Sequence, residues 1–279
     1  MRLTQEQVDE MNRVQKSLMR LFIDVCEKLN LNYYMVHGSL LGTIKYSNFF
    51  PLDDDIDVAM PRYDYDKLLE FGQAFFPDNI VLQSCKSEKE FPLAFAKLRD
   101  SNTTFIQTMM KGLKINQGIY IDIFPMDYYP KEQIKRKWLF LLSEIYKARI
   151  GTRINYETGE PVWKKILRGV SCVLCPSWEI AVQKRANLYV NISKTNEFIM
   201  VGGKDKERGI PIKWFGEGIQ HDFAGLSVRC PKMYAEYMSC IYGDYTNYNP
   251  SESYINDDGT VTVSAEVFST VEPYSAFIK

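Results

Sequence analysis

Residues 53–58 read Asp-Asp-Asp-Ile-Asp-Val, and this alternation of carboxylates with branched apolar side chains constrains the fold more than any other segment. In an extended strand successive side chains point to opposite faces, so Asp55 and Asp57 share one face and Ile56 and Val58 share the other, buried face. Two carboxylates on one face repel each other unless a cation lies between them. Oxygen ligands suit Mg²⁺ or, alternatively, Mn²⁺, so the segment predicts a metal site at Asp55 and Asp57.

A glycine-containing turn lies shortly before this segment. Residues 33–36 predict a short strand, and Gly38-Ser39 then begins a helix that runs through Ile44. The free backbone N–H groups at such a helix start bind anions, and Gly38 lets a phosphate approach closely. We therefore expect Gly38 and Ser39 to bind a substrate phosphate that faces the metal. Alone, an Asp-rich run also fits a solvated turn or a helix cap, and a Gly-Ser pair is weak support; the combination favours the metal site.

The two segments together resemble the signature of a known family. The matching runs are His37-Gly-Ser-Leu-Leu-Gly-Thr-Ile-Lys45, Phe50-Pro-Leu-Asp-Asp-Asp-Ile-Asp-Val-Ala-Met60 and Pro61-Arg-Tyr-Asp-Tyr65. They resemble the LicD family of phosphocholine transferases, which belongs to the nucleotidyltransferase-like superfamily and is similar to the fukutin group of sugar-phosphate transferases. The resemblance implies an α/β fold with a mixed sheet and flanking helices, a Gly-Ser turn that grips the donor phosphates, and an Asp-x-Asp strand that holds the metal.

Two basic residues are candidates to bind the same phosphates. Residues 80–83 and 91–98 read as strands, and Lys97 and Arg99 at the end of the second strand share a face by alternation. Because a transferred phosphoryl group needs positive charge beyond the metal, we expect both side chains to bind the donor. The family shows a similar basic pair. The alternative is a solvated strand end, since Lys and Arg are common on protein surfaces.

A third segment, residues 118–125, is strongly β-prone and carries one carboxylate, Asp122, in its middle. A lone charge inside such a strand is costly unless it faces a cation. The resemblance implies that Asp122 joins Asp55 and Asp57 from another strand, either as a third metal ligand or as the general base.

The chain is long enough for a catalytic core with a second lobe. It has 279 residues, of which 46% are hydrophobic, and this suffices for a sizeable core. The β-prone runs end near residue 129, and helical periodicity begins at Ile134. We therefore predict a nucleotidyltransferase-like core over residues 1–129, which begins with a long amphipathic helix. Residues 130–279 are predicted to form a helical and C-terminal region that packs on the core and frames the acceptor site.

Charge and hydropathy limit the partners. Lys and Arg number 34 against 35 Asp and Glu, so nucleic acid is not expected as a partner. The sequence shows neither a signal peptide nor a membrane-spanning run, and its six cysteines are scattered, which predicts a cytoplasmic protein. Residues 162–176 form a basic amphipathic segment with Trp163, Lys164 and Lys165, which suits peripheral contact with the inner face of an anionic membrane. The alternative is that its apolar side packs on the core.

Together these features predict a metal-dependent transferase. The resemblance implies that phosphocholine moves from CDP-choline to a sugar hydroxyl of a cell-surface glycan or its precursor, free or lipid-linked, such as teichoic acid or lipopolysaccharide. Two alternatives stay open: a transferase of the same fold that moves a polyol phosphate or a nucleotidyl group, and a catalytically silent nucleotide-binding protein. Departures from the family pattern at Lys45-Tyr46, Leu52 and Ala224 bear on substrate identity and leave the metal chemistry unchanged.

Overall fold

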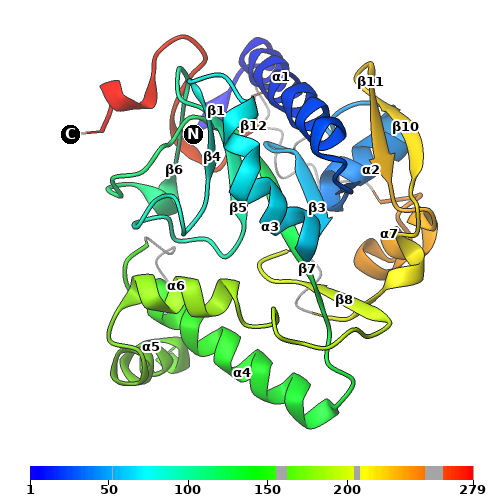
Figure 1. Cartoon of the computed structure of the whole chain (residues 1–279). Helices are drawn as coiled ribbons and strands as arrows, with labels where there is room; N and C mark the ends of the chain where they lie inside the picture. The colour runs from blue at the N-terminus through cyan, green and yellow to red at the C-terminus, as the bar shows by residue number, and fades with distance from the viewer. Residues whose placement is uncertain (52, 155–161, 204–207, 249–259, 279) are drawn as a thin grey trace.

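Figure 1 shows the computed structural model of the chain, in which a central sheet is flanked by helices. The structure describes residues 1–279 except residues 52, 155–161, 204–207, 249–259 and 279, and it does not describe the side chains of residues 162–167. Helices and strands both contribute to the core, so the predicted α/β class is confirmed.

The largest sheet has seven strands, and its centre is a ten-residue strand, β7. The strands span Tyr34–Met35 (β2), Asp57–Pro61 (β3), Ile80–Gln83 (β4), Ala96–Asp100 (β5), Ile119–Tyr128 (β7), Glu197–Met200 (β8) and Ile210–Pro211 (β9). The order along the sheet is β2, β3, β7, β5, β4, while β8 also pairs with β7, and β9 pairs with β8. The pair of β3 and β7 is parallel and the others are antiparallel, so the sheet is mixed, as predicted.

One face of this sheet is apolar and is covered by two helices, α1 (Gln5–Leu29) and α3 (Arg62–Phe71) (Figure 1). The helix α1 begins at a capping box: the N–H of Gln7 donates to the Thr4 hydroxyl, and the N–H of Thr4 donates to the Gln7 side chain. Alternate strand residues meet the helices in a core that includes Phe22, Val58, Leu68, Leu98, Ile121 and Ile123. This packing fixes which face of each strand is left for polar side chains.

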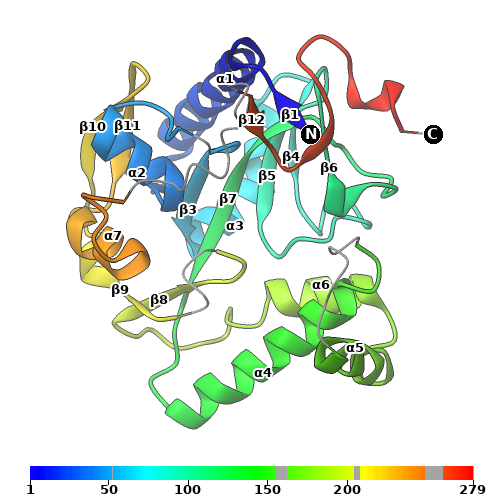
Figure 2. The same ribbon diagram turned by 180° about the vertical axis from the view of Figure 1, so that it is seen from behind.

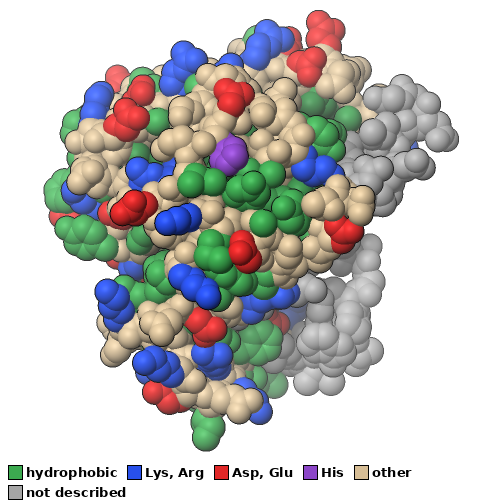
Figure 3. All heavy atoms as spheres, turned by 90° about the vertical axis from the view of Figure 1, so that its right-hand side faces the viewer, with side chains coloured by type: hydrophobic (Ala, Val, Ile, Leu, Met, Phe, Trp, Pro, Cys, Tyr) green, Lys and Arg blue, Asp and Glu red, His purple; other side chains and the backbone are tan. Residues whose placement is uncertain are grey.

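A second group of elements lies beside the edge strand β2. It contains α2 (His37–Tyr46), the hairpin of β10 (Ile219–Phe223) and β11 (Leu226–Cys230), and α7 (Tyr234–Tyr242). The hairpin turn is Ala224-Gly225, and both residues have positive φ angles, of 51° and 80°, as a tight two-residue turn requires. Figure 3 shows the side of the molecule that carries these elements, and side chains of both charge signs are interspersed on it.

Three helices from the second half of the chain lie together at the end of the molecule farthest from α1 (Figures 1 and 2). They are α4 (Gln133–Ile150), α5 (Val162–Leu174) and α6 (Trp178–Ala186). Their positions agree with the helical periodicity of the sequence. Short 3-10 helices span Gly72–Phe75, Thr108–Met110, Ile212–Trp214 and Tyr274–Ala276.

The sheet and the chain ends connect the two regions predicted from the sequence. After α6 the chain returns to the large sheet, where Tyr128 of β7 pairs with Phe198 of β8. Near the C-terminus, β12 pairs with β1 and β13 pairs with β6. These four strands span Val261–Thr262 (β12), Arg2–Leu3 (β1), Ala265–Ser269 (β13) and Thr104–Gln107 (β6). The division at residues 129 and 130 stays a prediction, and the structure shows that β-pairing crosses it.

One predicted strand is shorter than expected, and one predicted contact lies outside the described residues. The apolar run 91–98 joins the sheet only from Ala96, because Phe91 and Phe95 are buried in the preceding loop without strand pairing. The predicted membrane contact relied on Trp163, Lys164 and Lys165, whose side chains lie outside the described residues. Within the described part of the chain, no helix combines the length and apolar character needed to cross a membrane.

Candidate active site

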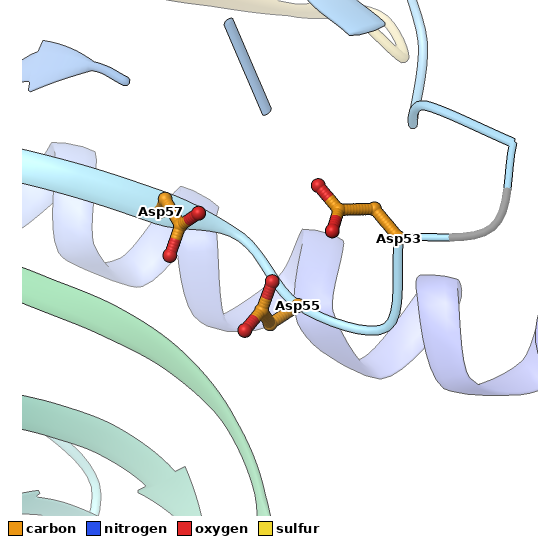
Figure 4. A group of neighbouring side chains, drawn as sticks. All are labelled: Asp53, Asp55 and Asp57. Carbon is orange, nitrogen blue, oxygen red and sulfur yellow. The ribbon is translucent and has the colours of Figure 1, made fainter. Parts of the chain in front are cut away.

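Three carboxylates converge where the chain enters β3. Asp57 is the first residue of this strand, and Asp53 and Asp55 lie on the loop before it (Figure 4). One oxygen atom from each of the three carboxylates lies within 4.8 Å of the others. The carboxylates at every second residue therefore lie on one side of the chain, as predicted for a regular strand, although the strand itself begins only at Asp57.

Backbone hydrogen bonds on both sides hold this loop in place. The N–H of Asp57 donates to the hydroxyl oxygen of Ser39 at 2.8 Å, and the N–H of Asp122 donates to the carbonyl of Ile56 at 2.7 Å. The N–H of Val36 donates to the carbonyl of Asp57 at 3.1 Å. These hydrogen bonds fix the backbone that carries the aspartates between α2 and β7.

The helix α2 begins at His37, directly beside the carboxylates. His37 has a φ of +50°, which is uncommon for a residue with a side chain, although histidine adopts it more often than most residues do. Its Nδ1 lies 3.6 Å from Oδ2 of Asp57, and its ring packs edge-on against Phe124. The backbone at this turn therefore directs a buried imidazole towards Asp57.

Gly38 lets the first turn of α2 approach Asp53. A Cβ atom at position 38 would lie only 1.9 Å from Oδ2 of Asp53, so a side chain there would displace the Asp53 carboxylate. The Asp53 carboxylate thus lies against the amino-terminal end of α2, where the sequence predicted a donor phosphate. Ser39 is 2% exposed, and its hydroxyl oxygen accepts a hydrogen bond from the N–H of Asp57. The Ser39 side chain therefore helps to position the backbone of Asp57. A carboxylate at a helix start is favourable because the helix dipole is positive there.

Strand register brings Asp122 and Lys97 beside the three aspartates. Asp122 on β7 is the neighbour of Asp57 on β3, and Lys97 on β5 is its neighbour on the other side. Nζ of Lys97 lies 2.5 Å from Oδ1 of Asp122 and 3.3 Å from the ring centre of Tyr120. Asp122 therefore pairs with a lysine and lies outside the group formed by Asp53, Asp55 and Asp57.

The buried charges perturb one another's pKa values. Burial raises the pKa of Asp55 well above its usual range, and Asp57 and Asp53 raise it further. Burial also raises the pKa of Asp122 to about 6, although Lys97 acts in the opposite direction. The pKa of Lys97 is lowered by burial, against the effect of Asp122. A cation among the aspartates would stabilise their ionised forms.

Arg99 has a different environment from Lys97, although the two side chains share a face. Its Nε donates to Oε1 of Gln83 at 2.5 Å, and its Nη1 donates to the carbonyl of Gly118 at 2.6 Å. The side chain is fully buried and stacks on Tyr120. These contacts indicate a structural role for Arg99 in place of the predicted contact with donor phosphates.

A cavity of about 420 Å³ lies next to this site, between the core and the helical region. Phe95 connects the two, because it lines the cavity and its ring centre lies 5.7 Å from Nζ of Lys97. The opposite wall comes from α4 and α6, and its polar members are Glu144, Lys147 and Arg185. A cavity of this size suits a small molecule or one to two sugar units.

Asp53 and His37 are site residues that the sequence reasoning did not include. The signal for Asp53 was present, because Asp53, Asp55 and Asp57 continue one two-residue spacing. His37 is the first residue of the recognised His-Gly-Ser run, but its positive φ angle could not be read from the sequence. The three aspartates supply only oxygen ligands, as Mg²⁺ and Mn²⁺ prefer, so the residues present fit a hard divalent cation.

Comparisons with known proteins match the part of the chain that carries these residues. A family model described as LicD/FKTN/FKRP, nucleotidyltransferase domain, matches residues 30–151, a range that contains α2, the three aspartates, Lys97 and Asp122. The chain is also 22% identical over 256 residues to the lipopolysaccharide cholinephosphotransferase LicD of Haemophilus influenzae. This alignment covers 85% of the chain and 90% of that relative.

Proposed function

Because the chain belongs to the LicD/FKTN/FKRP family of nucleotidyltransferase domains, as its motifs predicted, we propose that it is a transferase that moves phosphocholine onto a glycan. The proposed donor is CDP-choline, and the proposed acceptor is a sugar hydroxyl of a lipopolysaccharide-type glycan. The relative from Haemophilus influenzae supports the transferred group and the class of acceptor through its name. The CDP-linked donor follows from the resemblance.

The observation that carries this proposal is the group of Asp53, Asp55 and Asp57 beside the start of α2. We propose that these aspartates hold Mg²⁺, or alternatively Mn²⁺, which would neutralise the charge of the donor pyrophosphate. Asp57 is buried and the other two are partly buried, and the mutual repulsion of the three carboxylates favours a bound cation.

The chemical step needs a group that accepts the hydroxyl proton and positive charge beside the reacting phosphate. The acceptor hydroxyl oxygen forms a bond to the phosphorus that carries choline, the bond from that phosphorus to the bridging oxygen breaks, and CMP leaves with this oxygen. Asp122, with its pKa raised to about 6, is the candidate to take the hydroxyl proton near neutral pH. Lys97 orients Asp122 through their short hydrogen bond and adds positive charge beside the reacting phosphate.

The cavity beside Phe95 is the proposed entrance for the acceptor sugar. Phe95 lies between this cavity and Lys97, and the lining does not include the three aspartates, so we propose that an acceptor there approaches the donor from the side of Lys97 and Asp122. Its mixed lining of aromatic, apolar and charged side chains is of the kind that binds sugars. In this proposal the helical region frames the acceptor, as the sequence predicted.

A donor panel with two labels tests the proposed function. The purified chain is incubated with Mg²⁺, lipopolysaccharide or teichoic acid, and CDP-choline labelled separately in choline and in cytidine. We expect choline label on the glycan and cytidine label in free CMP. Cytidine label on the glycan would instead establish nucleotidyl transfer. Turnover of CDP-glycerol or CDP-ribitol alone would establish a polyol phosphate transferase, and binding without turnover of any donor would establish a silent nucleotide-binding protein.

A further inference from the structure

The helix α4 has an apolar stripe that no other described element covers. Ile134 is 86% exposed, Trp138 58% and Leu141 46%. These residues follow one another at intervals of four and three, so they lie on one side of the helix. Soluble surfaces carry isolated apolar side chains, but a row of three large ones that includes a tryptophan marks an interaction surface.

The opposite side of α4 faces the rest of the molecule. Ser143 and Ile150 on that side are buried, and Arg136 donates to Glu197 at 2.6 Å. Phe140 and Lys147 line the cavity described above. The stripe therefore points away from the core and from the cavity, and neither core packing nor the candidate active site explains it.

Basic side chains border the stripe. In residues 131–141 three exposed lysines, Lys131, Lys135 and Lys137, accompany a single carboxylate, Glu132. By helical geometry Lys135 and Lys137 flank the stripe on its two sides, and Lys131 lies just before the helix begins. Apolar residues with a tryptophan between lysines form the pattern of a helix that lies in the headgroup layer of an anionic membrane.

The position of α4 suits such a contact. It runs along the end of the molecule farthest from α1, in both views (Figures 1 and 2). Its neighbour α5 adds exposed apolar side chains at the same end, where Val173 is 82% and Leu174 59% exposed. We propose that α4 docks the chain on an anionic bilayer through the stripe of Ile134, Trp138 and Leu141. This proposal relocates the predicted membrane contact from residues 162–176 to a neighbouring helix and does not depend on the proposed activity.

Vesicle flotation with matched variants tests this proposal. The full chain is mixed at low salt with vesicles of phosphatidylglycerol and phosphatidylcholine, or of phosphatidylcholine alone. We expect the wild type to float with the anionic vesicles, and the double variant Ile134→Ser with Trp138→Ser to lose on the order of tenfold or more in affinity. Val271→Ser is the matched control, because Val271 is 85% exposed outside the helical region, and this variant should bind as the wild type does.

The charge component has its own variant. Reversal of Lys135 and Lys137 to Glu should weaken binding to anionic vesicles by about tenfold or more, and added salt should abolish the difference from the wild type. Thermal unfolding checks that each variant is folded. A wild type that stays in the unbound fraction, or a double variant that floats as the wild type does, would overturn the proposal. If Ile134→Ser with Trp138→Ser changes the oligomeric state and leaves vesicle binding unchanged, the stripe is an interface between copies of the chain, and the proposal is overturned.

Discussion

The two faces of strands β3, β5 and β7 are equally buried and chemically opposite. On the face under α1 and α3, Val58, Leu98 and Ile123 are fully buried and apolar. On the other face Asp57 is 3% and Lys97 1% exposed. The first face follows the ordinary rule for a core, whereas the second holds charges that burial disfavours. In the proposed function the charged face carries the chemistry, and the apolar face stabilises the fold.

The largest expected effect is on activity and comes from the charged face. Asp57→Asn keeps the size of the side chain and removes a charge that a metal needs, so we expect CMP release to fall by at least about 10²-fold. Thermal unfolding should be unchanged or shifted upwards, because a repulsive neighbour of Asp55 is removed. Asp54→Asn is the matched control: Asp54 belongs to the same run, but its carboxylate accepts from Ser264 and lies outside the group of three. Equal activities of the two variants would contradict the assignment.

The next effect is on stability and also comes from the charged face. Lys97→Met leaves Asp122 buried without its partner, which should lower the free energy of unfolding by about 3–5 kcal/mol. The double variant Lys97→Met with Asp122→Leu removes both charges and should regain most of this loss, although we expect it to be inactive. Urea unfolding measures both changes. A single variant as stable as the wild type would show that the pair does not contribute to stability.

The pH dependence of stability should reveal the raised pKa of Asp122. A carboxyl whose pKa rises to about 6 in the folded chain stabilises the fold fully below its unfolded pKa, and this stabilisation is lost as the pH rises through 6. In EDTA, the free energy of unfolding of the wild type minus that of Asp122→Asn should therefore fall between pH 4 and pH 7, by at most about 2–3 kcal/mol. A difference that stays constant or increases over this range would contradict the shift.

The smallest effect belongs to the apolar face. Ile123→Val removes one methylene group from the core beneath Asp122 and should cost about 0.5–1.5 kcal/mol of unfolding free energy. The rate of CMP release should stay near that of the wild type, because the side chain points away from the charges. Parallel urea unfolding and turnover assays check both expectations. A large loss of turnover would show that the two faces are not separable.

The sequence predicted the apolar face well and the charged face in part. Alternation placed Asp55 and Asp57 together and predicted the strand around Asp122, because these signals are local. The pairing of Lys97 with Asp122 depends on the register of strands that are 25 residues apart, which no local pattern encodes. Arg99 was expected in the site because it shares a face with Lys97. It lies two residues farther along β5, where its side chain donates hydrogen bonds to Gln83 and Gly118.

Apolar content misled in one place. The run from Phe91 to Leu98 has the composition of a strand, but its first residues are buried as loop side chains against other elements. Hydrophobicity reports burial, and burial does not require strand pairing. Asp53 was not predicted, although it continues the two-residue spacing of Asp55 and Asp57.

Binding of a divalent cation tests the central claim, that the charged face holds a metal, most directly. Mn²⁺ is titrated into the wild type, Asp55→Asn and Asp54→Asn, and the free ion is followed by electron paramagnetic resonance. We predict one saturable site in the wild type and in Asp54→Asn, and a loss of affinity of about tenfold or more in Asp55→Asn. Equal binding by all three proteins, or no saturable binding by the wild type, would contradict it.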